Sequence, residues 1–263
     1  MKFFCFVLVF SYSIISGFAQ VEENSIDSNL EARDSITQSY SERRNIVKLS
    51  LTSLALRNFQ FQYERSINRT FSLALGYSFI PEGAFPLEKQ ILKIIDDPEG
   101  SDIIQNAEFK YSAITPEVRI YLGKGYGKGF YLAPFYRHSK FSVKNVEFSY
   151  DTDEGGEKQV AASGSLKANT FGLVLGAQFN LGQRLVLDWY ILGPHYGTSN
   201  GNFAGVSNET LSDIEQQSLR DELEDIDLPI SDLSYDVNEN GAKIKIDGPW
   251  GGIRAGLSIG YRF

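Results

Sequence analysis

Five charged residues occupy positions inside segments of alternating polarity, where they could act together. They are three acids and two arginines: Glu64, Glu117, Arg119, Asp188 and Arg254. Their immediate neighbours are mostly apolar, as Val118 and Ile120 are beside Arg119. Because successive side chains of a strand point to opposite faces, these charges share the face opposite the apolar one. Burial of charge is costly unless the charge is paired, so we expect the five to form one interior ion network.

Residue types that support catalysis or metal binding are otherwise sparse. Of the two histidines, His138 precedes Ser139 on a predicted strand, so the two side chains face opposite ways and cannot form a nucleophile–base pair. His195 follows Gly193-Pro194 and is expected in a loop. Asp236–Gly241 begins like a calcium loop but lacks the closing Glu, which favours a polar turn. We therefore predict no enzyme activity, no cofactor and no metal site.

An acidic stretch runs from residue 205 to residue 240. It holds eleven acids and a single base. Ser212 and Glu215 match a capping box, which predicts a short helix. The apolar stripe from Leu211 to Ile226 is expected to cover the mouth of the fold. The charge would attract a divalent cation or a basic protein; the alternative is a solvated loop without a partner.

Period-two alternation of apolar and polar residues recurs along the chain and predicts strands. It is clearest in Phe71–Phe79, Phe171–Phe179 and Ile253–Phe263. Pro116 and Pro134 fall within expected strands, and proline cannot donate to the ladder, so we expect β-bulges there. We predict eight strands, at about residues 46–56, 59–67, 70–80, 109–122, 130–149, 165–179, 184–192 and 251–263.

The connections alternate between short turns and long links. Turns are expected near residues 68–69, 123–129 and 180–183, and long links at 81–108, 150–164 and 193–250. This arrangement is typical of outer-membrane barrels. A water-soluble β-sandwich would also alternate, but its interior would be apolar. We predict an all-β fold, a closed antiparallel transmembrane β-barrel over 46–263 with a short helix in the last long loop. A hairpin of 141–150 with 242–247 would raise the strand number to ten.

The N-terminus has the layout of a secretory signal peptide. Lys2 precedes an apolar run from Phe3 to about Ile15, and Gly17-Phe18-Ala19 supplies small residues before a cut at Gln20. The alternative, an N-terminal anchor, is disfavoured because the run is shorter than the roughly 20 residues that a spanning helix needs. We assign 1–19 to the signal peptide and 20–45 to a flexible periplasmic leader. With no other helical span in the sequence, a membrane role requires strands.

The chain ends in a pattern found in outer-membrane proteins. Ile259-Gly260-Tyr261-Arg262-Phe263 resembles the signal that such barrels present to their insertion machinery, with Tyr261 and Phe263 as its main residues. With eight strands the chain resembles the OmpA/OmpX-like small outer-membrane barrels. Segments 45–49, 61–66 and 116–121 resemble an uncharacterised barrel family of Bacteroidetes outer membranes. The resemblance implies outer-membrane lipid and the insertion machinery as partners, and no established activity.

Composition limits the possible functions. The net charge of −8 argues against a nucleic-acid partner, which requires basic residues to neutralise phosphates. An eight-stranded barrel is just wide enough for side chains to fill it, which favours a polar plug. We therefore expect an integral outer-membrane barrel with a filled interior and a structural or surface-interaction role. The alternatives are a small pore, with the ion network as a narrow proton or ion path, or a lipid-modifying barrel enzyme.

Overall fold

The computed structural model describes residues 43–94, 101, 104–123, 125–151, 157–224, 228 and 230–263. The predicted signal peptide and all of the predicted leader except residues 43–45 lie outside this part of the chain. Within the described ranges, no helix combines the length and the apolar character needed to cross a membrane.

Strands dominate the described chain, and short helices fill some of the links. The strands are β1 (Asn45–Ser50), β2 (Phe59–Ser66), β3 (Phe71–Gly83), β4 (Glu108–Tyr121), β5 (Gly129–Asp151), β6 (Glu157–Leu181), β7 (Leu185–Ser207), β8 (Asp232–Asn238) and β9 (Gly241–Arg262). The helices are α2 (Leu51–Leu54), α3 (Glu88–Leu92) and α5 (Asp213–Glu224).

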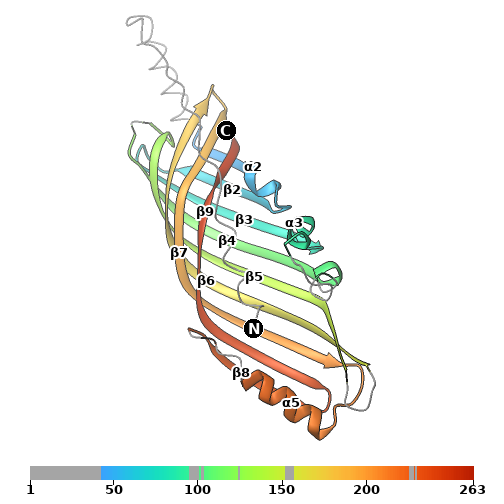
Figure 1. Ribbon diagram of the computed structural model, residues 1–263. Helices are drawn as coiled ribbons and strands as arrows, with labels where there is room; N and C mark the ends of the chain where they lie inside the picture. The colour runs from blue at the N-terminus through green and yellow to red at the C-terminus, as the bar shows by residue number, and fades with distance from the viewer. Residues whose placement is uncertain are drawn as a thin grey trace, which may run out of the picture.

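Eight of these strands close into a ring (Figure 1). Each pairs antiparallel with the next in the order β1 to β7 and then β9, and β9 returns to pair with β1. The chain ends meet in this last seam, where Phe263 N donates to Asn45 O at 2.9 Å and Asn45 N donates to Phe263 O at 3.1 Å. The predicted closed, antiparallel, eight-stranded sheet is confirmed.

The first predicted strand is too long. β1 ends at Ser50 rather than at residue 56, and α2 follows it directly. Ser50 stops the strand because its hydroxyl accepts a hydrogen bond from Ser53 N at 3.3 Å, which caps the helix. The link from β1 to β2 is therefore a helical turn rather than the short loop expected near residue 57.

The strands after β4 are longer than predicted, and much of the predicted 193–250 loop is strand. β7 continues to Ser207 and β9 begins at Gly241, so His195 lies within β7 and not in a loop. Residues 141–150 and 242–247 extend β5 and β9 and do not form a hairpin with each other. We call β8 together with residues 139–151, 157–168, 197–207 and 241–250 the strand extension.

The two strand prolines do not produce the bulges that we expected. The β4–β5 ladder pairs Ile114 with His138 and resumes at Glu117 with Phe135 in unchanged register, so Pro116 interrupts the ladder without shifting it. The described register shifts lie elsewhere, for example between Val143 and Val146. Proline removes one donor, and these strands tolerate that loss because the β3–β4 ladder at Pro116 and the β5–β6 ladder at Pro134 are unbroken.

Helix α5 lies on the strand extension. The predicted capping box is present: Ser212 N donates to Glu215 Oε2 at 2.8 Å, and Glu215 N donates to Ser212 Oγ at 3.3 Å. The apolar stripe of the helix packs through Leu223 on Val237 and Ala242. This contact places the helix on β8 and β9 at the far end of the molecule (Figure 1). That the whole stripe covers the mouth of the ring stays a prediction, because Ile226 lies outside the described residues.

Candidate functional site: a buried ion network inside the ring

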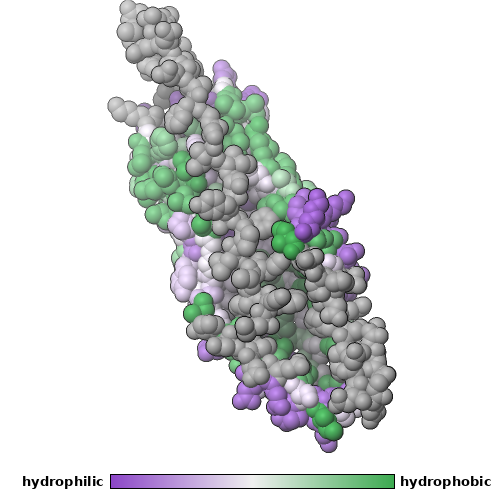
Figure 2. Space-filling model, viewed as in Figure 1, coloured by the Kyte–Doolittle hydropathy of each residue, from purple (hydrophilic) through white to green (hydrophobic). Residues whose placement is uncertain are grey.

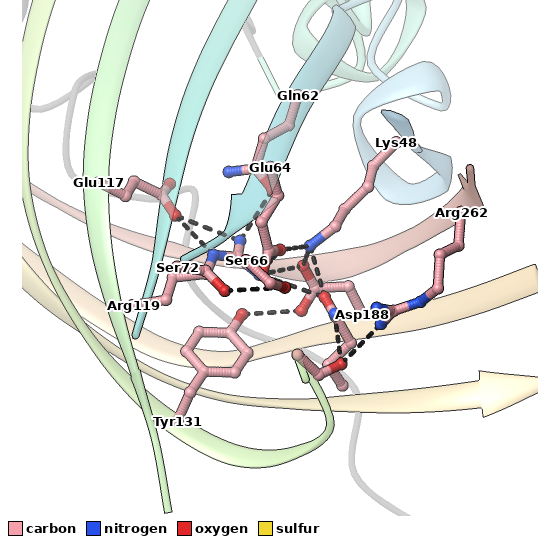
Figure 3. A network of polar contacts seen from close by, with 12 residues as sticks. Lys48, Gln62, Glu64, Ser66, Ser72, Glu117, Arg119, Tyr131, Asp188 and Arg262 are labelled. Atoms are coloured by element: carbon pink, nitrogen blue, oxygen red, sulfur yellow. Dashed lines mark hydrogen bonds and ion pairs between the residues drawn. The ribbon is translucent and has the colours of Figure 1, made fainter. Parts of the chain in front are cut away.

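Six charged side chains converge inside the ring. They come from five strands: Lys48 on β1, Glu64 on β2, Glu117 and Arg119 on β4, Asp188 on β7 and Arg254 on β9. Residues 48, 64, 117, 119 and 188 are at most 4% exposed, and the Arg254 side chain is 9% exposed. Three cations thus face three carboxylates in a site that is shielded from water. Figure 3 labels all of them except Arg254.

The Lys48 ammonium connects four strands. Its Nζ donates to Glu64 Oε2 at 2.5 Å, to Gln178 Oε1 at 2.5 Å and to Asp188 Oδ2 at 2.6 Å. An ammonium has three donors. All three are therefore used within the ring, and they join β1 to β2, β6 and β7 (Figure 3).

The Arg119 guanidinium lies at the centre of the network. Its Nη1 contacts Asp188 Oδ2 at 2.6 Å and Glu64 Oε2 at 3.1 Å, while Nε and Nη2 each donate to Glu117 Oε2 at 3.2 Å. The planar group also lies over the ring of Tyr131, 4.5 Å from its centroid. A rigid fork of five donors suits this role better than a flexible ammonium would.

Tyrosine hydroxyls complete the hydrogen bonding of the carboxylates. Tyr121 donates to Glu64 Oε1 at 2.7 Å, and Tyr131 donates to Asp188 Oδ1 at 2.8 Å. Together with Lys48, Arg119 and Arg254, these hydroxyls give each of the six carboxylate oxygens at least one donor. Buried charge is tolerated when it is paired and fully hydrogen-bonded in this way.

Arg254 extends the network from β9. Its Nη2 donates to Glu117 Oε1 at 2.8 Å, and its guanidinium lies over the ring of Phe135, 4.5 Å from the centroid. Glu117 thereby bridges two arginines whose strands, β4 and β9, lie on opposite sides of the ring.

A second set of polar contacts closes the end of the ring at which the chain terminates. Arg262 Nη2 donates to the carbonyl of Gly127 at 3.0 Å, and Gln178 Nε2 donates to the same oxygen at 2.8 Å. Gly127 has a φ of +58° in the turn between β4 and β5. A Cβ there would lie 3.1 Å from Gln178 Nε2, so glycine permits both the turn and its close approach to the ring.

The structure places all five predicted residues in one connected set of contacts. Sequence reasoning missed Lys48 and Arg262. Alternation could have revealed both, because Val47 and Leu49 flank Lys48, and Tyr261 and Phe263 flank Arg262. The two residues of the predicted assembly signal, Tyr261 and Phe263, are about half exposed on the outer surface beside the β1–β9 seam.

The arrangement suits structural cohesion better than chemistry. Every carboxylate is engaged by cations, and the network contains no nucleophile next to a base. His138 bonds Asn169 on the outer face, whereas the neighbouring Ser139 is buried on the other. In the described ranges, no group of three or more His, Cys, Asp or Glu side chains is placed to hold a metal ion. A cation or protein partner at the acidic helix stays a prediction, and part of that stretch lies outside the described residues.

Comparison with known proteins adds no relative: no family model, no curated protein and no solved structure matches this chain.

Proposed function

We propose that this chain is an integral outer-membrane β-barrel whose polar interior is a plug and whose strand extension projects from the cell surface as an interaction scaffold. One observation carries the proposal: the outward faces of the ring are apolar and exposed, whereas the inward faces hold the ion network and further polar side chains beside a cluster of small and aromatic ones. This is the reverse of a water-soluble β-protein, whose apolar residues lie inside.

The outward apolar residues form a continuous belt. On β3, β4 and β6 this belt spans Phe71–Phe79, 114–122 and Phe171–Phe179, which are nine residues each. Nine to eleven residues is the length that a tilted strand needs to cross a bilayer. Figure 2 presents the same division, with hydrophobic residues over the ring and hydrophilic residues gathered near α5.

The edge of the belt next to the strand extension supports insertion with strands tilted relative to the membrane normal. The last outward-facing apolar residues before the strand extension are Phe79, Ile114, Tyr136, Phe171, Tyr196 and Ile253. In the strand register this edge shifts by two residues from β3 to β4 and from β4 to β5, where Phe79 pairs with Ser112 and Ile114 with His138, and it is level from β5 to β7, where Phe171 pairs with both Tyr136 and Tyr196. Strands tilted by about 35–45° from the membrane normal produce such a shift at a flat membrane boundary.

The plug favours a closed barrel over a pore. The network bridges β1, β2, β4, β7 and β9 with side chains that exclude water, so a solute would have to break several ion pairs to pass. The interior is therefore a fold-specifying core, and function belongs to the surface beyond the belt. The chain ends and short turns face the periplasm, and the strand extension faces outward, as is usual for such barrels.

The test is reconstitution into lipid vesicles and planar bilayers. The unchanged protein should fold into phosphatidylcholine vesicles, protect the ring from protease and give no steady ion conductance. A stable conductance would contradict the plug and favour the pore alternative. Failure to insert, with the protein remaining monomeric in buffer without detergent, would overturn the membrane assignment.

A further inference from the structure

We infer that Lys140 and Lys167, on the outer face of the strand extension, form a binding site for the phosphate group of a membrane lipid. The inference rests on the proposed membrane insertion and deepens it by naming a lipid partner. The site lies outside the ion network and uses none of its residues.

The two lysines oppose each other directly. Lys140 on β5 and Lys167 on β6 are cross-strand partners, and both are exposed on the face that continues the apolar belt. Directly opposed residues have Cβ atoms about 5 Å apart, and like charges in this position are destabilising. A shared counter-charge relieves this repulsion, and a phosphate can accept hydrogen bonds from both ammonium groups.

Three other lysines on this face already have acidic partners. Lys144 contacts Glu82 at 2.7 Å, and Lys110 contacts the same carboxylate at 3.6 Å. Lys245 contacts Asp247 at 2.9 Å, and Asp247 also accepts from Asn200. Within the described part of the chain, Lys140, Lys167 and Lys243 form no ion pair, but Lys243 has Asp236 as its cross-strand neighbour, whereas Lys140 and Lys167 have each other.

The surroundings of the pair are rich in donors. A hollow of about 670 Å³ adjoins Lys140 and is lined by Ser142, Ser165 and Asn202 as well as by further lysines. Asp236 also lines this hollow, and Lys167 lines a second, neighbouring hollow that holds His138, Asn169 and the acids Asp232 and Asp247. Hydroxyl, amide and ammonium donors around one hollow suit the several oxygens of a phosphorylated headgroup.

The distance of the two lysines from the apolar belt indicates that the phosphate belongs to a lipid. Lys140 and Lys167 lie four residues beyond Tyr136 and Phe171, the last outward-facing aromatic residues of the belt on their strands, whose rings are 5.0 Å apart. Four residues of a strand tilted by about 45° rise about 9 Å above the apolar boundary. Long lysine side chains reach back toward that boundary, which places their charges among the phosphates of the headgroup layer.

The experiment compares matched charge-removal variants in detergent micelles. Binding of lipid A, a glycolipid with two phosphate groups, is measured by native mass spectrometry against its phosphate-free form and against inorganic phosphate. The test variant is Lys140→Gln/Lys167→Gln. The control, Lys110→Gln/Lys144→Gln, removes the same charge from the same face at residues that already have an acidic partner.

The unchanged protein should bind the phosphorylated lipid at least about tenfold more tightly than the phosphate-free form. The test variant should lose that preference, and the control should keep it. Equal loss in both variants would mean that general surface charge is responsible, and an unchanged preference in the test variant would overturn the site. Inorganic phosphate binding as tightly as the lipid would overturn the assignment to a lipid.

Insertion is scored separately, by protease protection in phosphatidylcholine vesicles. Failure of the unchanged protein to insert would overturn both this inference and the proposed function. Insertion without any preference for phosphate would overturn this inference alone.

Discussion

Replacement of Lys48 by methionine tests whether the interior network holds the ring together. Methionine is unbranched and close to lysine in length, so Lys48→Met removes the charge and three hydrogen bonds without leaving a large void. The three carboxylates would then face only Arg119 and Arg254. Glu64 Oε2 and Asp188 Oδ2, which now share the ammonium at 2.5 and 2.6 Å, would repel each other across a site without water.

The expected cost follows from this burial. Removal of one partner from a buried, hydrogen-bonded ion pair lowers the free energy of unfolding by about 3–5 kcal/mol. The double variant Lys48→Met/Glu64→Gln restores charge balance, so it should recover about 1–3 kcal/mol of that loss, the usual size of coupling between contacting residues. Lys110→Met is the control, because its exposed pair with Glu82 should contribute less than about 1 kcal/mol.

Urea unfolding in lipid vesicles, followed by tryptophan fluorescence, measures all three variants. A loss below about 1 kcal/mol for Lys48→Met would mean that the site is hydrated, since exposed ion pairs contribute no more than that. A double variant no more stable than the single one would also refute the reasoning, because charge imbalance would then not be the cause.

Three further outcomes are expected. Deletion of Phe263 should impair membrane assembly but not export, because it removes the last hydrogen bonds of the β1–β9 seam; normal heat-modifiable protein would argue against this. Arg254→Ala should cost about 3 kcal/mol by leaving Glu117 with one partner, and an unchanged urea midpoint would show that Arg254 is solvated. A short Gly-Ser linker in place of residues 210–232 should leave the ring folded, because α5 packs on the strand extension; loss of the folded band on gels would contradict this.

The ring was predictable because the alternation of apolar and polar residues along each strand agrees with the register that a closed ring requires. Alternation determines which residues face inward. A one-residue slip between strands would turn the polar residues outward and the apolar residues inward, so only one register is favourable. The five predicted network residues came together for that reason. Lys48 was missed because the first strand is short, with six residues, and was extended in the prediction into a helix that Ser50 caps.

The strand extension was not predictable from alternation, because its outer face is polar and its glycines resemble loop signals. Gly164 and Gly201 lie beside Phe203, whose ring would be 2.0 Å and 2.8 Å from a Cβ at those positions. Inside the ring, Gly176 similarly makes room for Tyr131, at 2.3 Å. These glycines make room for the aromatic rings of neighbouring residues, and they do not mark turns. The surface that receives α5 is part of the extension, so the helix was predicted but its partner was not.

The most direct test of the account uses a natural fluorescent probe on the apolar belt. Trp189 is 48% exposed on the outer face of β7, within the belt. The other tryptophan, Trp250, packs on Phe141 in the strand extension and can be replaced by phenylalanine. In Trp250→Phe protein reconstituted in vesicles, lipids brominated along their acyl chains should quench Trp189 strongly, and aqueous iodide should not. Quenching by iodide without quenching by brominated lipid would contradict the claim that this face contacts the membrane.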